Sequence, residues 1–141
     1  MSGDGLGLLS YAQTRVLVDD FAPSYRFYRE TLGLPLKHQD ESGLEPVDGP
    51  YACFVAGDAD LALFQRAFME AAVGAEHRPR EGVDAVVVVL RVADVDAAAE
   101  VLESRGAELA AAPVYQEAWG MRVAHLRAPE GTLIELCQYD G

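Results

Sequence analysis

Hydrophobic and polar positions alternate along this chain in the same order twice. A strand-like run over 14–18 leads into helical spacing that starts at Asp20, and a run over 85–92 leads into helical spacing that starts 74 positions later, at Asp94. Each half then ends in an apolar strand-like segment, at 61–65 and at 134–138. The repetition predicts two related half-domains, with a pocket along the pseudo-twofold axis between them.

Each half is expected to contain one helix among four strands. In the first half, the spacing predicts a strand over 13–18 and a helix over 22–32, with Pro23 in its first turn and Gly33 past its end. An apolar stripe at helical spacing is expected to face the core: Phe21, Tyr25, Tyr28 and Leu32. The other strands expected in this half are 36–38, 51–56 and 61–65. The second half repeats the scheme, with a strand at 86–92, a helix at 95–105, and strands at 108–109, 121–126 and 133–138.

The predicted fold class is therefore α+β, with two tandem βαβββ modules that form one cupped, mostly antiparallel sheet. A length of 141 residues fits a single domain with a substantial core. We expect module one to cover about 11–66, a connector about 67–82, and module two about 83–139, within one domain spanning 1–141.

Composition excludes several classes of partner. The net charge of -12 argues against nucleic acid, because phosphate contacts need clustered Lys and Arg. The longest apolar run, 85–90, is far shorter than the roughly 20 residues that a membrane-spanning helix needs. The first nine residues lack the basic start and apolar centre of a secretory signal, so we expect a cytoplasmic protein. Cys53 and Cys137 show no paired spacing and are expected to be buried thiols.

Two longer motifs resemble one known family. The stretch from Asp20 to Leu34, DFAPSYRFYRETLGL, and the stretch from Trp119 to Leu136, WGMRVAHLRAPEGTLIEL, resemble the opening and closing signatures of the vicinal oxygen chelate superfamily. This superfamily includes glyoxalase I, extradiol dioxygenases, fosfomycin-inactivating transferases and bleomycin-binding resistance proteins. The resemblance covers about residues 11–139 and specifies the fold rather than the activity. The closing turn has Ala128-Pro129 where Asp-Pro is usual.

The resemblance also implies where a divalent metal would be bound in the metalloenzymes of this superfamily. The four corresponding positions are Gln13, Ala62, Val87 and Glu135. Ala62 and Val87 offer no lone pair, and their neighbours in sequence are also apolar, so a shift of one residue does not restore a ligand. One carboxylate and one amide are too few for a tight transition-metal site. We therefore predict that the metal site is lost and that the protein uses no cofactor.

The polar residues of the predicted pocket allow more than one role. Glu135 either pairs with a pocket arginine such as Arg15 or accepts a cationic or hydroxyl-bearing ligand. Gln13 is expected to line the pocket. Strand alternation places Met121, Val123 and His125 on one face. His125 is then a general base, a replacement metal ligand or a structural histidine.

The leading hypothesis is a metal-free protein that binds a planar or hydrophobic small molecule, such as an antibiotic, and works as a homodimer. Tyr115 and Trp119 are expected at the pocket mouth, or over the core end of the hairpin, and Phe64 on the pocket floor. The predicted ligand-binding residues are Gln13, Arg15, Ala62, Phe64, Val87, Tyr115, Trp119, Met121, Val123, His125 and Glu135. Two alternatives remain open: a glyoxalase-type isomerase, lyase or transferase with an altered metal-ligand set, and a metal-free enzyme in which Glu135 or His125 shuttles a proton.

Overall fold

The structure is a computed structural model that describes residues 5–39, 41–74, 84 and 86–139. It confirms the α+β class. The first half contains β1 (Thr14–Val18), α1 (Phe21–Arg26), a π-helical segment (Phe27–Thr31), β2 (Tyr51–Ala56), β3 (Ala59–Gln65) and α2 (Arg66–Val73). Its sheet has the order β1-β3-β2, with β1 parallel and β2 antiparallel to β3. No helix in the described ranges is long and apolar enough to cross a membrane.

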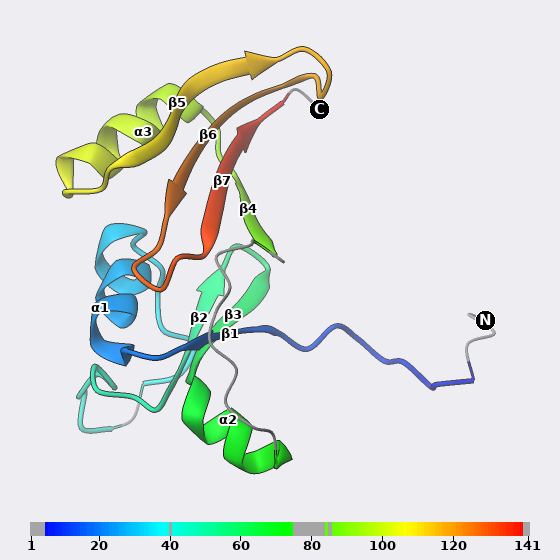
Figure 1. Cartoon of the computed structure of the whole chain (residues 1–141), viewed down its shortest axis with the longest axis vertical. Helices are drawn as coiled ribbons and strands as arrows, with labels where there is room; N and C mark the ends of the chain where they lie inside the picture. Colours follow the sequence, from blue (N-terminus) through cyan, green and yellow to red (C-terminus); the bar gives the residue numbers. More distant parts are fainter. Residues whose placement is uncertain (1–4, 40, 75–83, 85, 140–141) are drawn as a thin grey trace.

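The second half repeats this arrangement with one strand more. It contains β4 (Val87–Arg91), α3 (Val95–Ser104), β5 (Leu109–Gln116), β6 (Met121–Arg127) and β7 (Leu133–Gln138). The sheet has the order β4-β7-β6-β5, and only β4 and β7 run parallel. Figure 1 shows α1 and α3 on the same side of the two sheets, while α2 lies at the far end of the first sheet.

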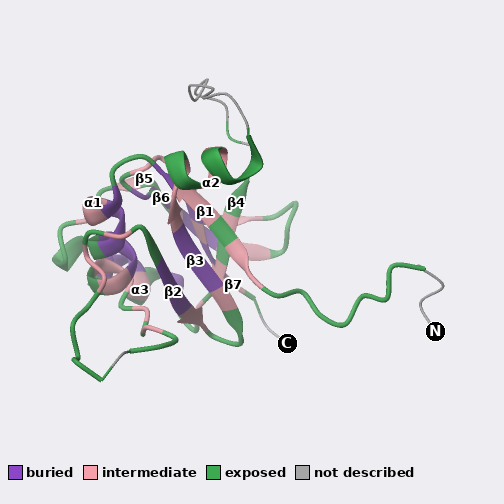
Figure 2. Ribbon diagram, turned by 90° about the horizontal axis from the view of Figure 1, so that it is seen from below, coloured by how far each residue is buried: buried purple, intermediate pink, exposed green. Residues whose placement is uncertain are grey.

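The two halves share one hydrophobic core beneath these helices. The first helix buries Phe21, Tyr25 and Tyr28, and α3 buries Val95, Ala99 and Leu102 at the same three positions of the repeat. These side chains belong to, or lie beside, a cluster that also contains residues of β2, β3, β6 and β7. Figure 2 shows the buried residues concentrated where the helices meet the strands.

The strand alternation gives each sheet a second face, directed away from this core, which we call its far face. On the first far face, Arg15 of β1 lies opposite Ala62 of β3, which in turn lies opposite Cys53 of β2. On the second far face, Val89 of β4 lies opposite Glu135 of β7, which lies opposite His125 of β6. Neighbouring positions in each strand, such as Leu63 and Leu136, point into the shared core.

Three predicted elements differ from the structure. The segment at 36–38 is not a strand but a single bridge between Leu36 and Phe54, because only a few residues pair with β2. The helix expected over 22–32 begins at Phe21 and changes to π-helical turns from Phe27. The strand expected at 108–109 extends to Gln116 as β5.

The length of β5 was missed for a physical reason. Its alanines have low β propensity, and Pro113 interrupts the pattern, so local sequence does not indicate a strand. Because β5 is the edge strand of its sheet, the missing N–H of Pro113 is tolerated there. The pairing register between β5 and β6 also shifts twice along the strand, which breaks the strict alternation that sequence reasoning relies on.

Candidate functional site

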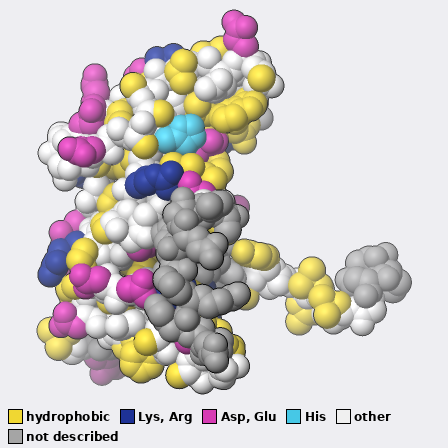
Figure 3. All heavy atoms as spheres, in the orientation of Figure 1, with side chains coloured by type: hydrophobic (Ala, Val, Ile, Leu, Met, Phe, Trp, Pro, Cys, Tyr) yellow, Lys and Arg dark blue, Asp and Glu magenta, His cyan; other side chains and the backbone are white. Residues whose placement is uncertain are grey.

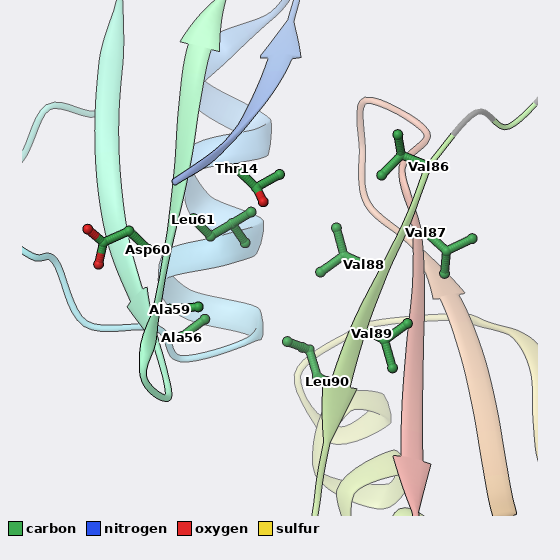
Figure 4. A pocket seen from close by; sticks show the side chains of 10 residues that line it. All are labelled: Thr14, Ala56, Ala59, Asp60, Leu61, Val86, Val87, Val88, Val89 and Leu90. Carbon is green, nitrogen blue, oxygen red and sulfur yellow. The ribbon is translucent and has the colours of Figure 1, made fainter. Parts of the chain in front are cut away.

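A cavity of about 240 Å³ lies at the junction of the two halves. It is bordered by the end of the β2–β3 hairpin on one side and by β4 on the other (Figure 4). Val88 and Leu90 point into the gap from β4, whereas Val87 and Val89 point to the opposite side of the strand. Most of the lining is apolar, and Val87 is the one predicted ligand-binding residue that contributes to it. The cavity therefore lies on the core side of β4, and the predicted polar residues do not line it.

The first far face is organised around Arg15. Both Nε and Nη2 of Arg15 donate hydrogen bonds to Oε1 of Gln13, at 3.1 and 2.9 Å. The amide nitrogen of Gln13 donates to the hydroxyl of Tyr51 at 3.1 Å and approaches Sγ of Cys53 at 3.8 Å. The strands thus hold Gln13 between β1 and β2, and Gln13 fixes the plane of the guanidinium.

Aromatic rings and α2 complete this arrangement. The guanidinium carbon of Arg15 lies 5.9 Å from the ring centroid of Tyr51 and 5.5 Å from that of Phe64. These distances allow cation–π attraction. Phe64 also contacts Phe68 of α2, with ring centroids 6.3 Å apart, and Nη1 of Arg15 approaches Sδ of Met69 at 3.8 Å. The first far face is therefore a cationic group framed by aromatic and sulfur-containing side chains.

The second far face carries one polar pair on an apolar surface. Nε2 of His125 and Oε1 of Glu135 are 2.9 Å apart, and their side chains are only 19% and 13% exposed. Val87 and Val89 border this pair and are themselves exposed. Figure 3 shows hydrophobic side chains gathered over the second sheet, beside a histidine ring. Of the two roles considered for Glu135, pairing with a pocket arginine such as Arg15 is not what the structure shows, because the carboxylate is hydrogen-bonded to His125.

The buried thiol on this face is not a reactive nucleophile. Burial raises the pKa of the Cys137 thiol, and the nearby Glu135 carboxylate raises it further. A thiol is a good nucleophile only as the thiolate, which needs the opposite shift. Cys53 and Cys137 are both buried and free, as the sequence predicted.

The structure brings most of the predicted residues together in two groups and places Tyr115 and Trp119 outside both. Gln13, Ala62 and Phe64 join Arg15 on the first far face, whereas Met121, Val123, Val87 and Glu135 join His125 on the second. Tyr115 lies opposite Arg122, whose guanidinium binds Asp96 of α3, so Tyr115 is on the helix side of the sheet. Trp119 lies in the turn between β5 and β6 and is 54% exposed.

Sequence reasoning missed Tyr51 and Met69 as members of the first group. Tyr51 reaches Gln13 only because the register pairs it with Phe64 across β2 and β3. Met69 reaches Arg15 because α2 folds back against β1 and β3. The apolar side chains of α2 recur at helical spacing, and this was the feature of the sequence that indicated packing of α2, and so of Met69, on a neighbouring surface.

The residues at the four expected metal positions do not fit a divalent ion. Ala62 and Val87 carry no donor atom. Oε1 of Gln13 already accepts two hydrogen bonds from the Arg15 guanidinium, whose positive charge would repel a metal at that oxygen. Within the described residues, no group of three or more His, Cys, Asp or Glu side chains is arranged to hold a metal. The donor chemistry therefore disagrees with the metal centre that the fold family implies.

Comparisons with known proteins agree with the fold. The Glyoxalase/Bleomycin resistance protein/Dioxygenase superfamily profile matches residues 10–136. The uncharacterized protein YraH of Bacillus subtilis (strain 168) is 35% identical over 126 residues, which cover 88% of this chain and 94% of that protein.

Solved structures give the same result. A protein of unknown function from Agrobacterium tumefaciens strain C58 matches with a TM-score of 0.73 and 25% identity, over 96% of this chain and 98% of that one. A lactoylglutathione lyase from Agrobacterium tumefaciens matches with a TM-score of 0.66 and 20% identity, over 94% of this chain and 95% of that one, which shows likeness of fold alone. The sequence match over nearly the whole chain confirms the resemblance of the two motifs, and the chain belongs to the Glyoxalase/Bleomycin resistance protein/Dioxygenase superfamily.

Proposed function

We propose that this protein is a metal-free small-molecule binding protein, of the kind that sequesters an antibiotic or another planar, hydrophobic compound. Sequestration requires only affinity, because a bound drug is removed from the free pool without any chemical step. The bleomycin resistance proteins of this superfamily are the guide to this function, and the chemistry of the far faces supports it.

One observation carries the proposal: the guanidinium of Arg15 occupies the amide oxygen of Gln13. A metalloenzyme of this family would need that oxygen for its metal, together with donors at Ala62 and Val87. Here the amide oxygen of Gln13 is taken by the Arg15 cation, and Ala62 and Val87 are apolar. The change removes the Lewis acid that would activate a substrate and leaves surfaces suited to holding one.

The second far face supplies apolar area for such a ligand. Val89 is 53% exposed, although it lies in a sheet whose other face is core, and Trp119 is also exposed, at the β5–β6 turn of the same sheet. Exposed apolar groups next to a few oriented polar groups are typical of small-molecule sites. The His125–Glu135 pair provides the oriented polar groups on this face.

We also propose that two copies pair, with the second copy covering part of these surfaces. The chain before β1 extends away from the body (Figure 1) and exposes Leu6, Leu8, Leu9 and Tyr11. An exposed apolar segment and an exposed apolar sheet face are features of oligomer contacts. Light scattering should give about twice the mass of the chain, 15.2 kDa, and a monomer at micromolar concentration would contradict this part. The free thiols support the cytoplasm as the compartment.

The function is tested by calorimetry on chelator-stripped protein, with nickel, zinc, manganese and ferrous iron. We expect no binding tighter than about millimolar, which corresponds to about 4 kcal/mol. A panel of antibiotics is then read by the fluorescence of Trp119, the single tryptophan. One ion per chain at micromolar affinity would overturn the proposal in favour of a metal-dependent glyoxalase-type enzyme.

The His125–Glu135 hydrogen bond supports a second candidate, a metal-free enzyme that transfers a proton. A carboxylate that fixes a histidine ring orients its other nitrogen for general base catalysis. A pure binder returns its ligand unchanged after prolonged incubation. Turnover that is lost in Glu135→Gln with ligand affinity retained would establish the enzyme instead.

A further inference from the structure

The charge of the ligand can be inferred from the two far faces. On the second far face, Glu135 is satisfied by His125, so its carboxylate is not available as the main partner of a cationic ligand. On the first far face, Arg15 forms no ion pair with a carboxylate of the described residues. We propose that Arg15 is an anion anchor that selects a planar aromatic carboxylate. This inference rests on the proposed function and names its ligand class.

The hydrogen bonds of Arg15 leave the correct donors for such a group. Nε and one N–H of Nη2 are directed to Gln13, and one N–H of Nη1 is directed to Met69. One N–H on each terminal nitrogen remains. Gln13 occupies the edge formed by Nε and Nη2, so the outer edge formed by Nη1 and Nη2 faces away from Gln13, and such an edge binds a carboxylate through two parallel hydrogen bonds.

Arg15 is also held in place before any ligand arrives. Its two bonds to Gln13, and the bond from Gln13 to Tyr51, connect β1 to β2 through side chains alone. A long side chain that is already ordered loses less entropy when it binds. Four other arginines are used differently, because each pairs with a carboxylate of the chain: Arg29, Arg66, Arg122 and Arg127.

The aromatic surroundings specify a flat ligand. Tyr51 and Phe64 lie on the far face with their ring centroids 6.1 Å apart and their planes at 76°. Tyr51 and Phe68 are both exposed, so ring surface is accessible beside the guanidinium. A planar ring attached to the carboxylate can stack on these groups while the carboxylate meets the outer edge of Arg15.

Because the protein as a whole is acidic, the position of Arg15 decides where an anionic ligand can bind. A net charge of -12 repels anions, although salt at cellular concentration reduces the repulsion beyond about 8 Å. An anionic ligand therefore needs a specific cation at close range. Arg15 supplies it on the face where the family's metal would have supplied positive charge.

The test compares two probes of one shape. 2-Naphthoate and 2-naphthamide have the same ring system, but only the first has a carboxylate, and their binding is measured by calorimetry at neutral pH. We expect 2-naphthoate to bind about 10- to 100-fold more tightly. In Arg15→Met this preference should disappear, so that the two probes bind with similar affinity. Arg15→Lys keeps the positive charge but not the two parallel N–H donors of the guanidinium, and it should keep only part of the preference.

Arg26→Met is the matched control, because Arg26 is exposed on α1 and the substitution makes the same change in net charge. It should leave the preference intact, and thermal unfolding should show that all variants are folded. If Arg26→Met lowers the preference as much as Arg15→Met, the anchor is wrong. If wild type binds 2-naphthamide as tightly as 2-naphthoate, the anion anchor fails while small-molecule binding stands. No binding of 2-naphthoate at millimolar concentration overturns the inference, and the antibiotic panel then decides the proposed function separately.

Discussion

The two halves of this protein bury the same positions but carry different chemistry. The first helix covers the core with Phe21, Tyr25 and Tyr28, and α3 covers it with aliphatic side chains at the same places in the repeat. On the far faces the difference is larger. The first half places its polar groups on its first strand, around Arg15, whereas the second places its carboxylate on its last strand, at Glu135.

The two halves agree at core-facing positions and differ at far-face positions. Core-facing residues of both sheets contact each other across the junction of the halves, so a change in one requires a change in several others. Exposed far-face residues such as Arg15 and Val89 are not part of this core cluster, so their identity can differ between the halves without a cavity forming in the core. A symmetric frame therefore holds an asymmetric site, with a cation on one face and an apolar surface on the other.

The largest effect is expected from equivalent core positions of the two halves. Leu63 of β3 and Leu136 of β7 are both buried in the shared core. Leu63→Ala and Leu136→Ala should each lower the free energy of unfolding by about 2–5 kcal/mol, because each leaves a cavity. Urea unfolding measures both. The far-face control Val89→Ala should change it by less than about 0.5 kcal/mol, and a large loss there would contradict the distinction between the faces.

A smaller effect is expected from the polar pair of the second far face. His125→Ala leaves the Glu135 carboxylate half-buried without its partner and should cost about 1–3 kcal/mol of unfolding free energy. The double variant His125→Leu/Glu135→Leu should recover most of that loss, since a well-packed apolar pair replaces a buried polar one. A double-mutant cycle in urea measures the coupling. Additive losses would show that the two side chains do not support each other.

Tyr28 of the first helix makes the unfolding free energy depend on alkaline pH, whereas the aliphatic residue at the same position of α3 does not. Burial raises the pKa of Tyr28 well above its ordinary value of 10.0, and the Glu130 carboxylate, 2.7 Å from the hydroxyl, raises it further. The unfolded chain thus loses this proton at lower pH than the folded chain. The stabilisation is complete below about pH 10 and declines as the pH rises towards the folded-state pKa.

Tyr28→Phe should remove this part of the alkaline decline and, at neutral pH, cost about 1–2 kcal/mol for the lost hydrogen bond. Unfolding free energy measured from pH 7 to 11 tests both expectations. A residual slope from Tyr25 should remain, because burial also raises its pKa. The aliphatic residue at the corresponding position of α3, Leu102, has no proton to lose, so a Leu102 variant should leave the slope unchanged.

Sequence alone predicted the frame because core positions follow local periodicity. The repeat, the α+β class and the buried stripe of the first helix were all visible in the spacing of apolar residues. The far faces were harder, since Tyr51 meets Gln13 only through pairing across β2 and β3. Tyr115 was expected either at the pocket mouth or over the core end of the hairpin, and its pairing with Arg122 puts it on the helix side of the sheet.

The smallest predicted effect concerns Gln13, which positions Arg15 without meeting the proposed ligand. Gln13→Ala removes two hydrogen bonds to the guanidinium, so Arg15 must be ordered when the anion binds. The affinity for 2-naphthoate should fall about three- to tenfold, while 2-naphthamide is unaffected. Gln13→Glu is the sharper control, because its carboxylate would pair with Arg15 internally and remove the preference as fully as Arg15→Met does. If Gln13→Glu still prefers 2-naphthoate, the anion is held elsewhere, and the asymmetry between the two far faces does not determine the charge of the ligand.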